Sequence, residues 1–163
     1  MTIPKIKIFT TGGSIDKYYA THESAFVVGE PAIAGALVEA NVTIDYEIES
    51  LLKKDSLELT DDDRQMIFER VAASLDRYIV ITHGTDTMIQ TARVLTSITD
   101  KVIVLTGAMQ PAAFKQTDAV FNVGGAIIAA QALPTGVYLV MNGRIFTPDG
   151  VRKNVTMDRF EDV

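Results

Sequence analysis

The chain has 163 residues, of which 47% are hydrophobic, and carries a formal net charge of −6 with an isoelectric point near 4.8. It contains no cysteine and two histidines, which excludes disulfides and thiolate metal sites and disfavours a histidine metal site. An acidic chain without a basic patch or a long apolar run does not fit binding to nucleic acid or a membrane. We therefore expect a small-molecule ligand and neither a metal nor an organic cofactor.

The length suits one hydrophobic core, so we expect a single domain over residues 1–163. The amino terminus leads into Lys5 and Lys7 without the pattern of a signal peptide, which predicts a cytoplasmic protein. Apolar periodicity predicts alternating strands and helices. In chain order these are a strand over 6–10, a helix over 31–40, a strand over 42–49, a helix over 61–75, a strand over 78–82, a helix over 86–98, a strand over 102–106, a helix over 119–133 and a strand over 137–141.

Two features of this series identify the fold class. The strands over 6–10, 78–82 and 102–106 are apolar at nearly every position, which is typical of parallel strands covered on both faces. The segment 119–133 is apolar or small almost all round, so we expect it to pack on the sheet and against another helix or subunit. The order predicts an α/β fold, a Rossmann-like or flavodoxin-like doubly wound parallel sheet with helices on both faces, in three layers.

Ligands of such sheets bind beyond the carboxyl ends of the strands, where this chain places glycines beside hydroxyl groups. Thr11-Gly12-Gly13-Ser14 follows the first strand, His83-Gly84-Thr85-Asp86 follows the third, and Gly107-Ala108-Met109 follows the fourth. Glycines allow close approach of the main chain to a ligand, and hydroxyl groups supply nucleophiles or hydrogen bonds. This composition indicates a site for a small polar ligand that bears a carboxylate.

A dinucleotide site and a purely structural role are the alternative interpretations of these residues. The first glycine turn lacks the G-x-G-x-x-G spacing of dinucleotide sites, and the chain has no P-loop. Ser14 and Thr85, taken singly, are explained as helix caps, and Asp86 as a first-turn acid. Taken together with Lys153, they form a set that can activate a weak nucleophile without histidine, and we interpret His83 as structural.

The motifs TTGGSID, VITHGTDTM and LTGAMQP, in this order and strand context, resemble the asparaginase/glutaminase family of bacterial type. The resemblance covers essentially the whole chain as the amino-terminal domain of that family, in a short single-domain branch. It implies conversion of L-asparagine to L-aspartate and ammonia through an acyl-enzyme intermediate, with L-glutamine as a weaker substrate.

The resemblance also implies roles for particular residues. Ser14 takes the place of the nucleophile, and Tyr19, or alternatively Tyr18, that of the lid tyrosine that hydrogen-bonds it. The second catalytic cluster is then formed by Thr85, Asp86 and Lys153. The substrate is implied to bind through Gly13, Ser56, Gly84, Asp86 and Ala108.

Four departures from the family pattern shape the remaining expectations. Serine stands at position 14 where threonine is usual, and leucine stands at position 57 where many members carry glutamine. The loop from Ser14 to Tyr19 is much shorter than in secreted members, and the usual second domain is not present in these 163 residues. We expect a homo-oligomer, a dimer or tetramer, to supply the missing wall of the site; the alternative is a site that tolerates being open. The alternative hypothesis is a catalytically impaired amino-acid-binding module of the same fold.

Overall fold

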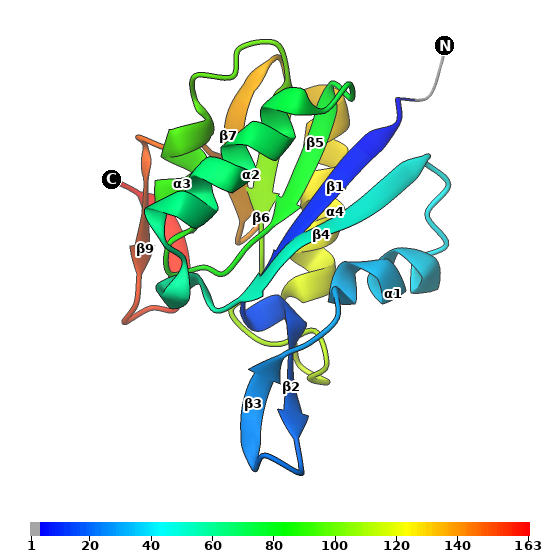
Figure 1. The fold of residues 1–163 in the computed structure, drawn as a ribbon, viewed down its shortest axis with the longest axis vertical. Helices are drawn as coiled ribbons and strands as arrows, with labels where there is room; N and C mark the ends of the chain where they lie inside the picture. The colour runs from blue at the N-terminus through cyan, green and yellow to red at the C-terminus, as the bar shows by residue number, and fades with distance from the viewer. Residues whose placement is uncertain (1–3) are drawn as a thin grey trace.

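The main sheet has six strands, five of them parallel. A computed structural model describes residues 4–163 (Figure 1). The strands lie in the order β4 (Tyr46–Lys54), β1 (Ile6–Gly12), β5 (Tyr78–Thr82), β6 (Val102–Thr106), β7 (Gly136–Met141) and β8 (Arg144–Phe146). Only β8 pairs in the antiparallel sense, with β7. The parallel strands, numbered along the chain, follow the order 2-1-3-4-5 of flavodoxin-like sheets, which confirms the predicted fold class.

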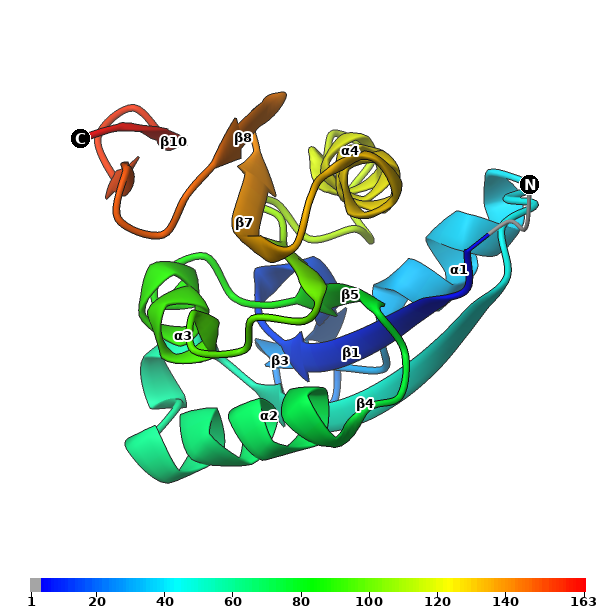
Figure 2. The ribbon, with the colours of Figure 1, turned by 90° about the horizontal axis from the view of Figure 1, so that it is seen from above.

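Four helices cover the two faces of this sheet and complete three layers (Figure 2). They are α1 (Ala32–Glu39), α2 (Asp61–Ala73), α3 (Met88–Leu95) and α4 (Ala119–Ala132). One buried cluster lies on the side of α2 and α3, and a second lies on the side of α1 and α4. Strands β1 and β6 are buried along their whole length, as their apolar sequences predicted. No helix within residues 4–163 has the length and hydropathy of a membrane span.

The start of α2 shows how local sequence fixes an element. The Thr60 hydroxyl accepts the Asp63 main-chain N–H at 3.1 Å, and the Asp63 carboxylate accepts the Thr60 N–H at 2.9 Å. This reciprocal pair is a capping box, which satisfies donors that the first turn leaves free. The predicted start of the helix at residue 61 is therefore confirmed.

Several predicted boundaries were wrong. The strand expected over 42–49 is β4, Tyr46–Lys54, because Val42 and Ile44 pack against the α1 and α4 side as part of the preceding loop. The helix expected over 86–98 begins only at Met88 and ends at Leu95. The outer side of α4 is not covered by any segment of residues 4–163, since Phe121 and Ile128 stay largely exposed.

Two short hairpins were not predicted. Strands β2 (Lys17–Ala20) and β3 (Ala25–Val28) form one, which projects from the body of the molecule (Figure 1). Strands β9 (Val151–Asn154) and β10 (Arg159–Asp162) form the other. Lys153, expected in a polar segment after the last predicted strand, therefore lies in a strand of its own.

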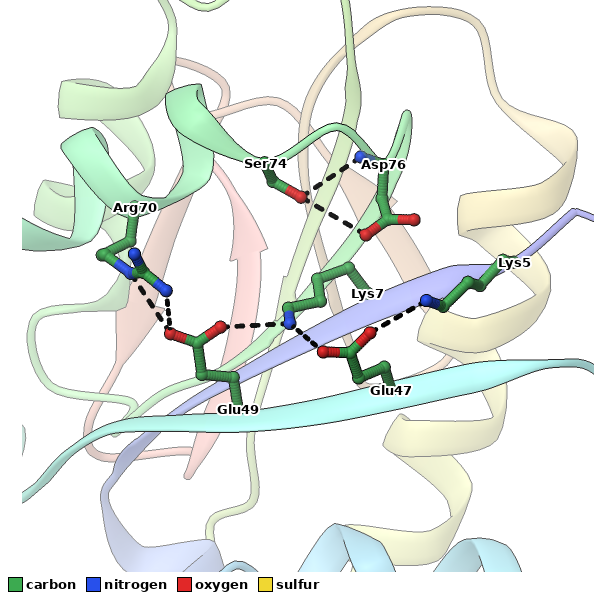
Figure 3. A network of polar contacts seen from close by, with 7 residues as sticks. All are labelled: Lys5, Lys7, Glu47, Glu49, Arg70, Ser74 and Asp76. Carbon is green, nitrogen blue, oxygen red and sulfur yellow. Dashed lines mark hydrogen bonds and ion pairs between the residues drawn. The ribbon is translucent and has the colours of Figure 1, made fainter.

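A charged network ties β1, β4 and α2 together near the amino-terminal half of the strands (Figure 3). The Lys7 ammonium lies 2.7 Å from a Glu47 carboxylate oxygen and 3.0 Å from one of Glu49. Arg70 of α2 pairs with Glu49, and Lys5 pairs with Glu47. Lys7 is 93% buried, and these two carboxylates compensate for the loss of its hydration.

Candidate active site

The glycines predicted at the strand ends lie against one another where the strand order reverses. Strands β1 and β5 are neighbours, and a Cβ atom added to Gly13 would overlap the main chain of Gly84. A Cβ added to Gly84 would lie 2.5 Å from Cβ and 2.6 Å from Oγ of Ser56, which follows β4. Gly13, Gly84 and Ser56 therefore meet beyond the carboxyl ends of three adjacent strands, at the position where flavodoxin-like sheets bind ligands.

Ser56 is held rigidly, yet its hydroxyl group lacks a protein partner. Its Oγ is buried and makes no hydrogen bond within residues 4–163. The Thr87 hydroxyl donates to the Ser56 carbonyl at 2.8 Å, and Asp55 accepts the Leu57 N–H at 3.0 Å. Lys17, at the base of the β2–β3 hairpin, pairs with Asp55 at 2.5 Å. A buried hydroxyl without a partner is uncommon and available to bind a polar ligand.

Lys153 joins β9 to the loop after β5. Its Nζ donates to Thr85 Oγ1 at 2.9 Å and lies 2.6 Å from Asp86 Oδ1. The Lys153 side chain is largely buried, whereas Asp86 is partly exposed. The structure thus brings together the three residues predicted as the second catalytic cluster, although Lys153 is 67 positions from Asp86. Because the ammonium donates to Thr85 Oγ1, the Thr85 proton is free to bond another acceptor.

His83 supports the loop from behind. Its Nδ1 lies 2.8 Å from the Gly84 carbonyl oxygen, and its Nε2 lies 2.7 Å from Thr91 Oγ1. A carbonyl only accepts, so Nδ1 carries the ring proton and Nε2 accepts from the threonine. Burial lowers the pKa of His83 to about 4, which keeps the ring neutral at pH 7. These contacts fit the structural role expected for His83.

The candidate nucleophile begins a short 3₁₀ turn, η1 (Ser14–Asp16). Ser14 follows Gly13 as Thr85 follows Gly84, so the two hydroxyl residues extend from glycines in contact. Asp16 closes the turn, accepts the Ala32 N–H at 2.8 Å and is almost fully buried. Burial, with a smaller contribution from the nearby Glu30 charge, raises the pKa of Asp16 to about 7.

The tyrosines lie on β2, away from hydrogen-bond contact with Ser14. The Tyr19 ring packs edge-on against Phe26 with centroids 5.4 Å apart, and Phe26 packs similarly against Phe114. Tyr18 lies against Gly29, and both tyrosines are about half exposed. No hydrogen bond joins either hydroxyl to Ser14 within the described residues, so their predicted role stays a prediction.

Ala108 is buried in the loop after β6, and Gly107 beside it approaches the His83 carbonyl so closely that a Cβ would overlap it. The sequence did not reveal what holds this loop, namely Asp118, directly before α4, and Asn122 within α4. Asp118 precedes α4 and looks like an ordinary cap, but its side chain makes no capping bond to its own helix.

The chain is similar to known proteins over nearly its whole length. The family described as "Asparaginase, N-terminal" matches residues 5–161. The Haemophilus influenzae "Probable L-asparaginase periplasmic" is 32% identical over 94% of this chain and 47% of its own length, and the Pseudomonas fluorescens "Glutaminase-asparaginase" is 30% identical over 95% and 47%. The structure titled "Probable Cytoplasmic L-asparaginase from Campylobacter jejuni" superposes with a TM-score of 0.82 and 27% identity, over 98% of this chain and 51% of that one.

The chain spans about half the length of the curated relatives it matches. The family match, by contrast, extends over nearly all of its residues and includes every strand of the main sheet and Lys153. The chain therefore belongs to the asparaginase family and corresponds to its amino-terminal domain.

Proposed function

We propose that this chain hydrolyses the side-chain amide of L-asparagine to give L-aspartate and ammonia, with L-glutamine as a weaker substrate. The observation that carries the proposal is the Lys153 ammonium bonded to both Thr85 and Asp86, beside the glycines that precede Ser14 and Thr85. Relatives named as asparaginase and glutaminase-asparaginase support the same substrates.

In the proposed first step, Ser14 Oγ attacks the carbon of the side-chain amide. The C–N bond then breaks, the nitrogen leaves as ammonia after it takes up a proton, and an ester forms on Ser14. In the second step water attacks the ester, and L-aspartate and the free Ser14 hydroxyl result. Thr85, held by Lys153, orients the attacking water and stabilises the charge that develops.

The proposed substrate position uses the remaining predicted residues. The α-carboxylate accepts from the unpartnered Ser56 hydroxyl and from main-chain N–H groups near Gly13 and Gly84. Asp86, whose carboxylate is partly exposed, binds the α-ammonium group. The Ala108 carbonyl accepts the side-chain amide N–H. This scheme gives the α-carboxylate, the α-ammonium group and the side-chain NH₂ group of L-asparagine each a partner of opposite character.

We further propose that residues 1–163 fold as one domain and that copies of the chain associate through α4. Its exposed Val120, Phe121 and Ile128 lie beside an apolar groove of about 450 Å³ between α1 and α4. Apolar faces of this kind occur at subunit contacts. Sedimentation that shows a monomer at micromolar concentration would remove this interface.

A cytoplasmic location is also proposed, on the analogy of the Campylobacter jejuni protein described as cytoplasmic. The relative from Haemophilus influenzae is named periplasmic, so the two relatives offer opposite precedents. Fractionation of the source cells decides between them, and recovery in the periplasmic fraction would contradict the proposal.

The test of function is ammonia release from L-asparagine by the purified chain, with L-glutamine in parallel. Wild-type turnover that disappears in Ser14→Ala and Thr85→Val supports the hydrolase and both hydroxyl groups. Phe121→Ser, on the far side of α4, checks in the same assay whether association contributes to activity. Binding of L-asparagine without turnover would instead support the impaired binding module, for which the exposed Leu57 in place of glutamine is the specific observation.

A further inference from the structure

Asp118, directly before α4, and Asn122, within α4, bind the loop after β6 and together form the α4 clamp. Asn122 Nδ2 donates to the Gly107 carbonyl at 2.9 Å. Asp118 accepts the main-chain N–H of Met109 at 2.9 Å and that of Gln110 at 3.0 Å. Asn122 Nδ2 also donates to Asp118 Oδ2 at 2.9 Å, so the two side chains act as one unit. These bonds hold the residues on either side of Ala108 and use no atom of Ala108 itself.

The planarity of the peptide bond shows which way the N–H and the carbonyl of Ala108 point. In a trans peptide bond the C=O and the N–H lie in one plane and point in opposite directions, and no peptide bond within residues 4–163 is cis. The Gly107 carbonyl points at Asn122, so the Ala108 N–H of the same plane points away from it. The Met109 N–H points at Asp118, so the Ala108 carbonyl points away from Asp118. Both polar groups of Ala108 are thus turned away from the α4 clamp.

Ala108 also lies close to the rest of the site. Gly107 contacts the His83 carbonyl so closely that only glycine fits, and His83 immediately precedes Gly84 and Thr85. The Ala108 side chain is buried, so rotation of this segment would require the local core to move. The orientation of its carbonyl is therefore fixed by this packing together with the bonds from Asp118 and Asn122.

The clamp contains a feature that stability alone does not explain. Asn122 is 99% buried, and its Oδ1 has no hydrogen-bond partner within residues 4–163. An unsatisfied buried acceptor destabilises a protein. The side chain nevertheless uses both amide hydrogens, one on the loop and one on Asp118, which fits a residue whose role is to hold the loop.

We propose that Asp118 and Asn122 are positioning residues that aim the Ala108 carbonyl at the side-chain amide of the substrate and so select an amide over a carboxylate. A carbonyl accepts a hydrogen bond from an amide NH₂ group but repels a carboxylate oxygen, so its orientation discriminates L-asparagine from L-aspartate. This inference rests on the proposed function, because it assumes that Ala108 faces the amide end of the substrate.

The experiment compares Asp118→Asn with wild type for hydrolysis of L-asparagine and for competitive inhibition by L-aspartate. Asparagine at 118 keeps one acceptor but places NH₂ against the second loop N–H. We expect kcat/KM for L-asparagine to fall on the order of 10²-fold, as for misplaced catalytic geometry. The inhibition constant of L-aspartate should change by less than about threefold, because that ligand has no side-chain N–H to donate to the Ala108 carbonyl. Equal losses for both ligands would overturn the positioning role.

Two further variants separate positioning from general damage. Thr117→Val removes the bonds to the Gln110 carbonyl and the Ala119 N–H but leaves both peptide planes of Ala108 anchored. It should therefore retain the wild-type ratio of kcat/KM for L-asparagine to the inhibition constant of L-aspartate. Asn122→Ala frees the Gly107 carbonyl, while Asp118 still holds the peptide plane that carries the Ala108 carbonyl, so its loss of selectivity should be smaller than that of Asp118→Asn. Loss of the ratio in Thr117→Val as well would contradict the inference.

The proposed function and the positioning role can fail separately. If wild type releases no ammonia, hydrolysis is refuted. The positioning role is then tested by calorimetric titration, which measures the affinities for L-asparagine and L-aspartate. A selective loss of L-asparagine affinity in Asp118→Asn would still support the positioning role, provided that the NMR signals of the main-chain amides shift mainly at residues 107–110. Unchanged binding of both ligands would overturn the positioning role, and so would a spectrum that shows unfolding of the whole protein.

Discussion

Substitution of Gly84 by alanine tests the close contact on which the site depends. The added Cβ would lie 2.5 Å from Ser56 Cβ, whereas ordinary contacts begin at 3.4 Å, an overlap of about 0.9 Å by subtraction. The main-chain angles at Gly84 are accessible to alanine, so the effect is steric. Overpacking of this size costs about 1–3 kcal/mol. For a chain of this length the melting temperature should fall by roughly 2–12 °C.

Activity should fall much more than stability in this variant. To remove the overlap, either the Ser56 segment or the loop with Thr85 must move by nearly the whole 0.9 Å. A displacement of about 1 Å can cost roughly 10²-fold in rate when it separates binding groups from reacting groups. We therefore expect kcat/KM for L-asparagine to drop by about two orders of magnitude while the protein remains folded at 25 °C.

The assay pairs ammonia release with thermal unfolding, and Gly35→Ala is the matched control. A Cβ at Gly35, within α1, meets no atom within 4 Å. Alanine there should stabilise the helix by about 0.5–1 kcal/mol and leave activity unchanged. If Gly84→Ala retains both wild-type kcat/KM and wild-type melting temperature, the contact between Gly84 and Ser56 is not as close as described and the reasoning fails.

Three further predictions concern single charged groups. Lys153→Met should abolish ammonia release while the melting temperature changes by only a few degrees, because the methionine still fills the space of the lysine stem; retained turnover would exclude Lys153 from catalysis. Lysine partners lower the pKa of Glu47 to about 2, and Arg70 lowers that of Glu49, so the stability they contribute is present above about pH 4.5 and lost as pH falls toward 2. In Lys7→Met the free energy of unfolding, measured by urea titration, should fall less steeply as the pH is lowered. An unchanged pH dependence would contradict the role given to these ion pairs. Burial raises the pKa of Asp16, so the native state binds its proton more tightly and loses stability as pH rises from about 4 to 7; Asp16→Asn should remove this loss, at most about 4 kcal/mol, and a wild-type pH profile would refute it.

The strands of the central sheet were predictable because their signal is local. The runs that form β5 and β6 are apolar at consecutive positions, and the structure places both with the predicted bounds. The predicted range of the edge strand β4 ended too early because its second half, Ser50–Lys54, mixes two leucines with a serine and two lysines and has no continuous apolar run. In the structure this half pairs only with β1, so one edge faces solvent and tolerates charged side chains.

The site was predictable in composition but not in its supports. The rule that parallel strands present ligand-binding residues at their carboxyl ends was enough to select Gly13, Gly84 and Thr85. This rule does not reveal side chains of a neighbouring helix that hydrogen-bond to a loop of the site. Asp118 and Asn122 stand at an i, i+4 spacing that an isolated helix also uses for local stabilisation, so their sequence pattern does not reveal the loop that they hold.

Lys153 shows how a residue far along the chain can be placed as accurately as those on the sheet. In the β9–β10 hairpin, Lys153 is directly opposite Phe160, and Val151 lies two positions away, so all three side chains share one face. Val151 and Phe160 are both buried in the core cluster beside α2 and α3. An isolated two-stranded hairpin is only marginally stable, so these two apolar anchors, together with the bonds to Thr85 and Asp86, hold it in place. The Lys153 ammonium therefore depends on burial of its neighbours, and a cavity made at Phe160 should loosen the catalytic cluster before it unfolds the sheet.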